Sequence, residues 1–372
     1  IRQLTSGDWP AEATVGLDEK RRQLYFVGWQ ETPLERQLFR VSLDAGPIEQ
    51  LTTDAGMHGA EVAPDFTSFI DVWSSRQTPP TVTVRSLSGG AERPVHSPAE
   101  IDLELRPPEF HRFRNRDGIE LHAAIYLPPK LERNPPPLAG EGRVGAGARP
   151  PVIVSVYGGP GPQMVNESWG QTVDLSAQLL AQHGFVVLKV DNRGSARRGL
   201  AFEAPIARNL GEIEVNDQVD GVRWLGTLGV ADSSRVGVIG WSYGGYMTLM
   251  ALLKAPEVFK AGVAGAPVSF WEGYDTAYTE KYLGTPQDNS EGYHRGSALT
   301  DADRLHGKLL LIHGMIDENV HFRHTARMMQ ALIDAGRPFE TLIYPNERHM
   351  PRSEKDRADM ERRILEFFQK NL

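Results

Sequence analysis

Cysteine is absent from the 372 residues, so the chain forms no disulfide and uses no thiolate as a nucleophile. Long apolar runs are absent as well, and no stretch approaches the roughly 20 residues that a membrane-spanning helix needs. Neither sign of charge dominates, because 40 Lys and Arg are mixed along the chain with 48 Asp and Glu. We therefore expect neither a nucleic acid nor a membrane surface as a partner.

The start of the chain has neither an initiator methionine nor a signal-like segment. It reads Ile1-Arg2-Gln3-Leu4, which predicts a piece of a longer protein whose targeting peptide, if there is one, lies upstream. The length suffices for two domains. The lack of cysteine leaves the redox compartment open.

A weak internal repeat occupies the first part of the chain. Leu24–Trp29 recurs as Ser68–Trp73, and Gln37–Val41 is echoed by Val82–Arg85. The offset of about 45 residues matches one four-stranded propeller blade, although two unrelated meanders of similar length are the alternative. Two blades alone would leave sheet edges bare. We therefore expect residues 1–105 to be the last blades of a β-propeller whose other blades lie upstream.

The pattern changes after residue 105, and we expect a second domain over 106–372. Phe110–Asn115 and Ile119–Tyr126 flank Asp117-Gly118, which predicts a β-hairpin. Residues 134–150 are rich in Pro and Gly and predict a low-complexity surface insertion.

From Pro151 onward, short apolar runs alternate with helical patterns, which is typical of an α/β fold with a mostly parallel sheet covered on both faces. Ligands of such sheets bind beyond the C-terminal ends of the strands. The predicted strands are Val152–Val156, Phe185–Val190, Val236–Ile239, Ala261–Ala264, Leu309–Ile312 and Thr341–Tyr344. The predicted helices are Val173–Gln182, Val215–Thr227, Tyr246–Leu253, His321–Ala335 and Asp356–Lys370.

One stretch between a predicted strand and a predicted helix carries the pattern G-x-S-x-G. It reads Gly240-Trp241-Ser242-Tyr243-Gly244 and is typical of a nucleophile elbow. The serine must adopt a cramped backbone conformation there, and side chains at Gly240 and Gly244 would collide. A glycine-rich turn with a chance serine is the alternative, which the flanking strand and helix disfavour.

A serine nucleophile needs a base and a carboxylate that orients it, in the chain order Ser, Asp or Glu, His. Asp317 and His349 follow successive predicted strands, so both can lie above the sheet near Ser242. Ser242 would be the nucleophile, His349 the general base and then acid, and Asp317 the orienting group. Glu318 is the alternative to Asp317, and His313 is expected to shape the turn after its strand.

An oxyanion hole needs two donors directed at the developing charge. We expect the backbone N–H of Tyr243 and the hydroxyl of Tyr157, at the end of an earlier strand. The glycine-rich loop after Tyr157 lacks the Lys-Ser/Thr of a phosphate-binding loop, and we expect no cofactor. His321 and His324 could chelate a metal, but without a third ligand nearby an exposed helix face is the favoured interpretation, and no metal is expected.

Three aromatic residues, Trp271, Tyr274 and Tyr278, have the spacing i, i+3, i+7 of one helix face. They form either a core stripe or the wall of a pocket. Flat rings would suit a flat, compact side chain such as that of proline.

Several motifs in this order resemble the prolyl oligopeptidase family of serine peptidases, and within it the dipeptidyl peptidase IV branch. The resemblance covers about 110–372 firmly and 1–105 loosely. Its marks are Val190–Ser195, Glu214–Gln218, Gly240–Tyr246, Ala266–Ser269, His313-Gly314 with Asp317, Asn319, Val320 and His321, and finally His349.

The resemblance implies an α/β-hydrolase domain capped by a β-propeller. It makes Ser242, Asp317 and His349 the catalytic triad and Tyr157 with Tyr243 the oxyanion donors. It also assigns a proline pocket to Tyr243, Val268, Trp271, Tyr274, Tyr278, Asn319 and Val320.

The activity implied is that of a serine exopeptidase releasing N-terminal X-Pro or X-Ala dipeptides from peptides through an acyl-enzyme. An acylaminoacyl peptidase, a prolyl endopeptidase and a catalytically silent binding protein are the alternatives. The glutamates that grip the substrate's free N-terminus in that branch would lie upstream of this chain, in another part of the same protein. The resemblance also implies a homodimer and a periplasmic or secreted location.

Overall fold

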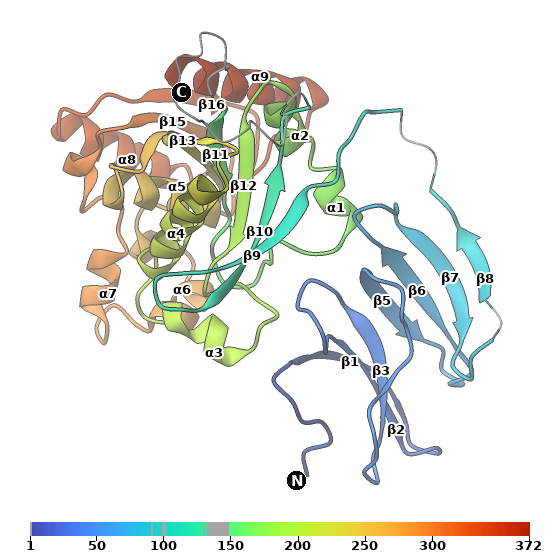
Figure 1. The fold of residues 1–372 in the computed structure, drawn as a ribbon. Helices are drawn as coiled ribbons and strands as arrows, with labels where there is room; N and C mark the ends of the chain where they lie inside the picture. The colour runs from blue at the N-terminus through green and yellow to red at the C-terminus, as the bar shows by residue number, and fades with distance from the viewer. Residues whose placement is uncertain (1, 91, 99–101, 130, 132–148) are drawn as a thin grey trace. The chain divides into compact units, whose positions relative to one another are not determined.

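The computed structural model describes residues 2–90, 92–98, 102–129, 131 and 149–372, which form two compact units (Figure 1). Of the insertion expected at 134–150, all but Arg149 and Pro150 lies outside the described residues. Unit 1 consists of Ile1–Pro108, Val165–Gln178 and Ala196–Ala201, and unit 2 of Glu109–Met164, Leu179–Ser195 and Phe202–Leu372.

Unit 1 contains two four-stranded antiparallel sheets, each a meander in chain order. Their second and third strands coincide with the two halves of the sequence repeat, as expected for propeller blades. The first sheet is formed by β1 (Ala11–Asp18), β2 (Gln23–Gly28), β3 (Gln37–Ser42) and β4 (Glu49–Gln50), and the second by β5 (Met57–Val62), β6 (Ser68–Ser74), β7 (Thr81–Ser86) and β8 (Glu92–His96).

The two sheets of unit 1 share a core to which both contribute buried side chains, among them Tyr25 and Phe69. On the other face of the first sheet, Phe26 and Phe39 stack with ring centroids 5.4 Å apart, and Trp9 stacks on both. Alternate residues of one strand thus pack on opposite faces, as the two-residue period of a strand requires.

Unit 2 is built on an eight-stranded sheet with the order β16-β15-β14-β13-β11-β12-β10-β9 (Figure 1). The hairpin of β9 and β10 pairs antiparallel with β12, and the other neighbours are parallel. The strands are β9 (Glu109–Arg114), β10 (Glu120–Tyr126), β11 (Pro151–Ser155), β12 (Val186–Asp191), β13 (Asp232–Trp241), β14 (Phe259–Gly265), β15 (Lys308–Gly314) and β16 (Glu340–Tyr344).

Helices cover both faces of this sheet. A Cβ placed on Gly262 would lie 2.6 Å from Leu252 of α5 (Tyr243–Lys254), and one placed on Gly237 would lie 2.7 Å from Phe368 of α9 (Glu354–Asn371). Gly262 pairs with Val238, the neighbour of Gly237, so these two glycines face opposite sides and α5 and α9 lie on opposite faces. The α/β fold with a doubly covered, mostly parallel sheet is therefore confirmed.

Each of the five predicted helices is present with shifted boundaries. The predicted helix Val173–Gln182 begins two residues later than expected, at Leu175, and a separate short helix ends just before it at Thr172. The α-helices are α1 (Trp169–Thr172), α2 (Leu175–Gln182), α3 (Leu200–Glu203), α4 (Ile213–Leu228), α5 (Tyr243–Lys254), α6 (Thr276–Leu283), α7 (Ser290–Arg295), α8 (Arg323–Asp334) and α9 (Glu354–Asn371). The described residues therefore contain four α-helices that were not among the five predicted, namely α1, α3, α6 and α7. Short 3₁₀ helices span Ala204–Ile206, Trp271–Gly273 and Ala302–Arg304.

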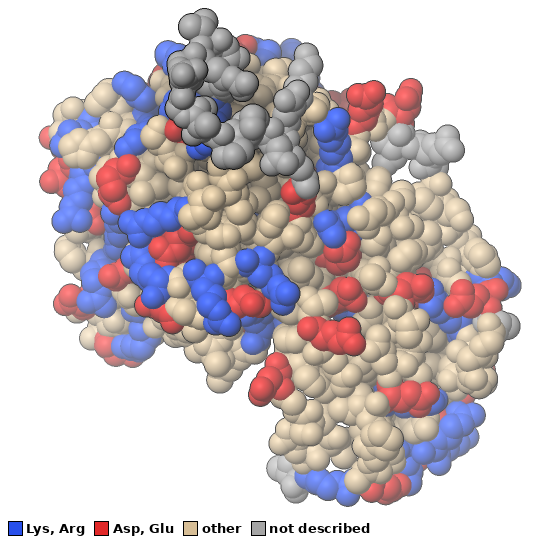
Figure 2. Space-filling view, in the orientation of Figure 1, with Lys and Arg blue, Asp and Glu red and all other residues tan. Residues whose placement is uncertain are grey.

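On the face shown in Figure 2, acidic and basic side chains are interspersed, in keeping with the mixture of charges along the sequence. None of the helices in the described ranges is both long and apolar enough to cross a lipid bilayer.

The packing of α5 on the sheet gives a test of the fold. Leu252 of α5 is fully buried, and Leu228 at the end of α4 is 40% exposed. Leu252→Ala should lower the free energy of unfolding by about 2–5 kcal/mol, because it removes buried methyl groups and leaves a cavity. Leu228→Ala should change it by less than about 0.5 kcal/mol. Chemical denaturation followed by fluorescence measures both, and similar losses in the two variants would contradict the described packing.

Candidate active site

Ser242 lies in the turn between β13 and α5. Its φ of 61° and ψ of −117° are in a sparsely populated region that costs about 1–3 kcal/mol. Its N–H donates to the Gly265 carbonyl at 2.8 Å. A Cβ on Gly240 would lie 2.3 Å from the Gly244 carbonyl oxygen, and a Cβ on Gly244 would lie 2.2 Å from that of Val156. Only glycine fits these two positions, so the predicted strand–turn–helix elbow is confirmed.

Asp317 follows β15, and its buried carboxylate accepts four hydrogen bonds. His349 Nδ1 donates to Oδ2 at 2.7 Å, and His313 Nε2 approaches the same oxygen at 3.1 Å. The backbone N–H groups of Asn319 and Val320 donate to Oδ1 at 2.9 and 3.0 Å. Burial alone would raise the pKa of Asp317, but the hydrogen bonds from the two histidines hold that pKa well below its ordinary value. Asp317 is therefore a carboxylate at neutral pH.

Glu318, the alternative to Asp317, points elsewhere. Its exposed carboxylate forms an ion pair with Arg348, which lowers its pKa. Asp317 is the carboxylate that contacts His349, so the geometry favours it as the orienting acid. His313 lies at the end of β15 as expected, but it also contacts the acid, which the sequence reasoning did not anticipate.

His349 lies on the loop between β16 and α9. Because its Nδ1 donates to Asp317, its Nε2 is left as the acceptor, which is the form a general base needs. The indole Nε1 of Trp241, the residue before Ser242, donates to the His349 carbonyl at 2.6 Å. The backbone of the predicted base is thus anchored to the residue that precedes the predicted nucleophile. Within the described ranges no hydrogen bond joins the Ser242 hydroxyl to His349.

Tyr157 and Tyr243 lie beside each other near the elbow, with ring centroids 5.8 Å apart. Tyr157 follows β11 and is half-buried, and burial raises the pKa of its hydroxyl, which therefore keeps its proton and can donate. Tyr243 is the first residue of α5, where a backbone N–H has no partner within the helix. The two expected oxyanion donors thus come from the ends of neighbouring strands.

The loop after Tyr157 is held by residues to which the sequence analysis gave no role. Asn192 Nδ2 donates to the Gly158 carbonyl at 2.8 Å, and Gln218 Nε2 donates to Asn192 Oδ1 at 2.8 Å. Gly158 has a φ of 78°, and a Cβ there would lie 2.9 Å from Met247. Asn192 and Gln218 both belong to motifs that carried the resemblance. These motifs were therefore the sequence signal that could have identified the two residues as supports of the loop.

Glu214 is a second buried carboxylate close to the site. It accepts hydrogen bonds from the Tyr243 hydroxyl at 2.8 Å and from the N–H groups of Gly211 and Glu212 at 2.9 and 3.1 Å. Burial outweighs these bonds and raises its pKa to about 6. Glu214 was part of a quoted motif, but nothing in the sequence showed that it fixes the Tyr243 side chain.

The three aromatic residues are brought together, but not on one helix as the spacing predicted. Trp271 lies in a 3₁₀ turn, Tyr274 is extended, and α6 begins only after Asp275, whose carboxylate accepts from the Tyr278 N–H. The sequence analysis did not recognise Asp275 as an N-cap. Because the helix begins only after this residue, Trp271 and Tyr274 do not lie on the same helix as Tyr278. The rings still meet: Trp271 stacks on Tyr278 with centroids 6.2 Å apart, and Tyr274 packs edge-on against Tyr278 at 5.5 Å.

The other predicted pocket residues adjoin this aromatic group. Tyr243 packs on Trp271 with ring centroids 5.6 Å apart, and the Tyr274 hydroxyl donates to Asn319 Oδ1 at 2.7 Å. Val268 and Val320 are buried in the same core as Trp271. The predicted set therefore forms one group, partly core and partly accessible, next to the loop that carries Asp317.

The expectation of an exposed helix face at His321 and His324 is wrong for one of them. His321 is exposed and precedes α8, whereas His324 is buried in its first turn. Its Nδ1 accepts from the Ser269 N–H at 3.2 Å and its Nε2 donates to the Gly273 carbonyl at 3.1 Å. In the part of the chain that the structure describes, no group of three His, Cys, Asp or Glu side chains is placed to hold a metal.

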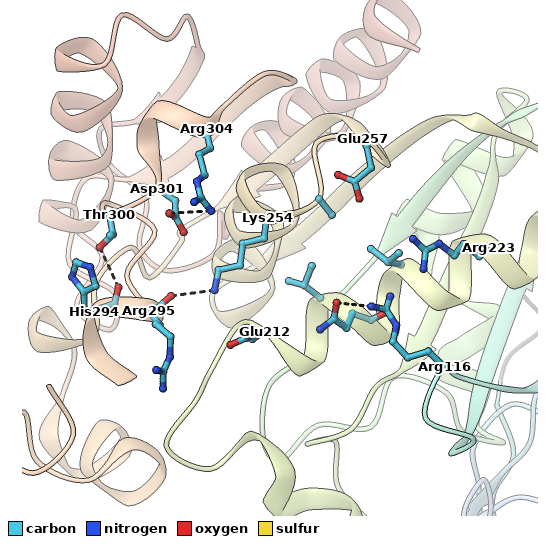
Figure 3. A pocket seen from close by; sticks show the side chains of 14 residues that line it. Arg116, Glu212, Arg223, Lys254, Glu257, His294, Arg295, Thr300, Asp301 and Arg304 are labelled. Atoms are coloured by element: carbon cyan, nitrogen blue, oxygen red, sulfur yellow. Dashed lines mark hydrogen bonds and ion pairs between the residues drawn. The ribbon is translucent and has the colours of Figure 1, made fainter. Parts of the chain in front are cut away.

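Figure 3 shows a cleft lined by charged side chains, none of them a predicted site residue. Its cations are occupied: Lys254 donates to the Arg295 carbonyl, Arg304 pairs with Asp301, and Arg116 is bonded to Asn216. Because these groups satisfy one another, the cleft gives no reason to place the chemistry there, and the elbow remains the candidate site.

Two family profiles match the sequence. Residues 171–372 match the family described as "Prolyl oligopeptidase family", and residues 1–80 match "Dipeptidyl peptidase IV (DPP IV) N-terminal region".

Dipeptidyl peptidase 8 of Mus musculus and that of Homo sapiens are each 35% identical over 388 residues, covering 99% of this chain and 42% of their own length. The crystal structure of Porphyromonas gingivalis dipeptidyl peptidase 4 superposes with a TM-score of 0.89 at 31% identity, covering all of this chain and 51% of that one. The chain thus spans about half the length of its relatives or less. With one profile matching over half of the chain and the elbow in its expected place, the chain belongs to the prolyl oligopeptidase family.

Proposed function

We propose that this chain carries the catalytic centre of a serine peptidase that releases X-Pro, or X-Ala, dipeptides from the N-terminus of peptides. The observation that carries the proposal is the Asp317–His349 hydrogen bond beside Ser242 in its left-handed elbow conformation. A base held in one tautomer close to a serine at a strand–helix elbow is the arrangement that acyl transfer requires.

In the first half of the reaction, Ser242 Oγ attacks the carbonyl carbon of the scissile bond while His349 Nε2 takes its proton. The negative charge that develops on the carbonyl oxygen is stabilised by the Tyr157 hydroxyl and the Tyr243 N–H. The C–N bond then breaks, and His349 returns the proton to the leaving amine. The product is an ester between Ser242 and the dipeptide.

In the second half, water attacks the ester carbonyl carbon while His349 Nε2 takes its proton. The C–O bond to Ser242 then breaks as His349 returns the proton to Ser242 Oγ, and the dipeptide leaves with a free carboxylate. Asp317 keeps His349 in the tautomer that accepts at Nε2 and stabilises the imidazolium that forms in each half. No cofactor or metal enters these steps.

The aromatic group supports a proline or another small residue before the cleaved bond. Trp271, Tyr274 and Tyr278 offer flat faces close to Tyr243, and flat rings pack well on a compact ring. The relatives named as dipeptidyl peptidases support exopeptidase action, while acylaminoacyl peptidase and prolyl endopeptidase remain the competing activities. The homodimer implied by the resemblance stays a prediction.

Substrates with and without a free N-terminus test the proposed activity. The whole polypeptide that contains this chain should hydrolyse Ala-Pro- and Gly-Pro-p-nitroanilide, because it should recognise a free amine two residues before the cleaved bond. N-acetylated Ala-Pro-p-nitroanilide is the control and should react far more slowly. Cleavage of the blocked substrate without cleavage of the free ones would replace the proposal by endopeptidase or acylaminoacyl peptidase activity.

Substitution of the nucleophile and the base tests the mechanism. Ser242→Ala and His349→Ala should each reduce turnover on the order of a million-fold, as loss of one triad member removes the activated nucleophile. A fluorophosphonate should label the wild type at Ser242 and leave Ser242→Ala unlabelled. Ser234→Ala, at an exposed serine of the same β13, should retain both activity and labelling. A loss below about a hundredfold in the first two variants would contradict their roles.

The buried carboxyl of Glu214, which fixes the ring of an oxyanion donor, predicts a pH dependence of stability. Its pKa in the folded state, about 6, exceeds the ordinary value of 4.5. Between these values the folded chain keeps a proton that the unfolded chain loses, so stability falls as the pH rises. The contribution is complete below pH 4.5 and is lost as the pH passes 6, roughly 2 kcal/mol in all.

Glu214→Gln should remove this dependence, because glutamine does not titrate. Denaturation at pH 4.5, 5, 6 and 7 should show the wild type losing its advantage over the variant by roughly 2 kcal/mol across the range. Glu212→Gln, at an exposed neighbour, should keep the wild-type dependence. Parallel curves for wild type and Glu214→Gln would show that this carboxyl does not titrate in the range.

A further inference from the structure

The segment Ser269–Tyr274, which carries two of the three pocket rings, has little structure of its own. Its only regular part is the three-residue 3₁₀ turn Trp271–Gly273, and the flanking Phe270 and Tyr274 are extended. Its internal backbone hydrogen bonds, from Gly273 to Phe270 and from Tyr274 to Trp271, are long at 3.3 and 3.2 Å. A segment with so few internal bonds must take its shape from its neighbours.

The neighbour that spans the segment is His324, in the first turn of α8. Its imidazole is fully buried, with Nδ1 accepting from the Ser269 N–H and Nε2 donating to the Gly273 carbonyl. One partner can only donate and the other can only accept, so these contacts fix a single neutral tautomer. Burial also lowers the pKa of His324 to about 4, which agrees with a neutral ring at neutral pH.

Other contacts also join α8 to the segment Ser269–Tyr274, but each of them reaches only one part of the segment. The Ser269 hydroxyl donates to the His324 carbonyl at 2.8 Å, and the Arg323 guanidinium donates to the Gly273 carbonyl. The Phe270 ring packs on the His324 imidazole with ring centroids 4.7 Å apart. The Arg327 guanidinium lies over the Phe270 ring, 4.1 Å from the centroid of that ring. Among these side chains, His324 is the one that bonds both ends of the segment.

The attachment also connects the aromatic wall to the acid. The loop Asp317–Val320 comes just before α8 and contributes Asn319 and Val320 to the pocket. Thr325, the residue after His324, is hydrogen-bonded to His313 Nδ1 at 2.7 Å, and His313 contacts Asp317. Two consecutive residues of α8 therefore have different contacts. His324 holds the segment that carries the aromatic rings, and Thr325 holds His313, which contacts Asp317.

From this geometry we propose that His324 is a positioning residue that fixes the aromatic wall and thereby sets the preference for the residue before the cleaved bond. It acts through its hydrogen bonds to Ser269 and Gly273 and through its edge-on contact with the Tyr274 ring, at 6.5 Å between centroids. The inference rests on the proposed peptidase function. Loss of His324 should let the wall relax, which weakens binding of a proline ring more than it weakens the chemistry at Ser242.

The test compares His324→Leu, which removes both hydrogen bonds at similar size, with His324→Gln, whose amide can accept and donate at neighbouring atoms. Each is assayed with Gly-Pro- and Gly-Ala-p-nitroanilide and with p-nitrophenyl acetate, which has no side chain to place in the pocket. Active sites are counted by fluorophosphonate titration, so misfolded protein does not enter the rates. His294→Gln, at an exposed histidine of α7, is the matched control.

We expect His324→Leu to raise KM for the proline substrate about 10- to 100-fold, the effect of leaving buried hydrogen-bonding groups unpaired. The ratio of kcat/KM between the proline and alanine substrates should fall, and the acetate rate per active site should stay within about threefold. His324→Gln should recover most of the ratio. If His324→Leu does not fold, His324→Asn, which can keep only the bond from Ser269, should show an intermediate fall in the ratio.

Two results would overturn the proposal. One is an unchanged ratio in His324→Leu or His324→Asn while the wild type cleaves both anilides. The other is an equal loss on the anilides and on the acetate, which would mean that His324 supports the whole site rather than the pocket wall. A wild type that cleaves neither anilide would instead refute the proposed function, and the positioning role with it.

Discussion

The ionised carboxylate of Asp317 is the group on which the geometry of the candidate site depends. A carboxylate removed from water is costly unless donors replace its hydration. Here two imidazoles and two backbone N–H groups do so, and each donor fixes a different part of the site. The bond from His349 orients the predicted base, and the bonds from Asn319 and Val320 shape a loop that also borders the predicted pocket. His313 is in turn bonded to Thr325 of α8. Satisfying one charge thus organises the predicted acid, base and pocket together.

Glu214 shows how much the kind of donor matters. Both carboxylates are buried and both accept several hydrogen bonds, yet their pKa values move in opposite directions. Asp317 contacts two imidazoles, whereas the donors to Glu214 are backbone amides and the neutral hydroxyl of Tyr243. Burial acts to raise the pKa of both carboxyls. At Glu214 the hydrogen bonds do not offset it, whereas at Asp317 the bonds and charge of the histidines do, and the charge is held. The first situation suits a support for a tyrosine ring, and the second suits a partner for a base.

Much of this could be read from the sequence, because the strands are continuous apolar runs and the elbow is a local constraint. Gly240 and Gly244 have to be glycine for reasons that act within a few residues, and the order of Ser242, Asp317 and His349 follows from strand order. What the sequence did not reveal depends on tertiary contacts or competing local signals. Asp275 caps α6 and interrupts the aromatic period, and His324 is buried where the segment Ser269–Tyr274 packs against it. The roles of Glu214 and Asn192 appear only once the elements are assembled.

The bond from the Trp241 indole to the His349 carbonyl has a consequence for how a change at Trp241 acts on the site. The loop between β16 and α9 is also held by the bond from the Ile316 N–H to the Glu347 carbonyl and by the bond between His349 and Asp317. The Trp241 indole adds an attachment from the residue that precedes Ser242 to the main chain of His349. A change at Trp241 would therefore reach Ser242 through the chain and His349 through the hydrogen bond.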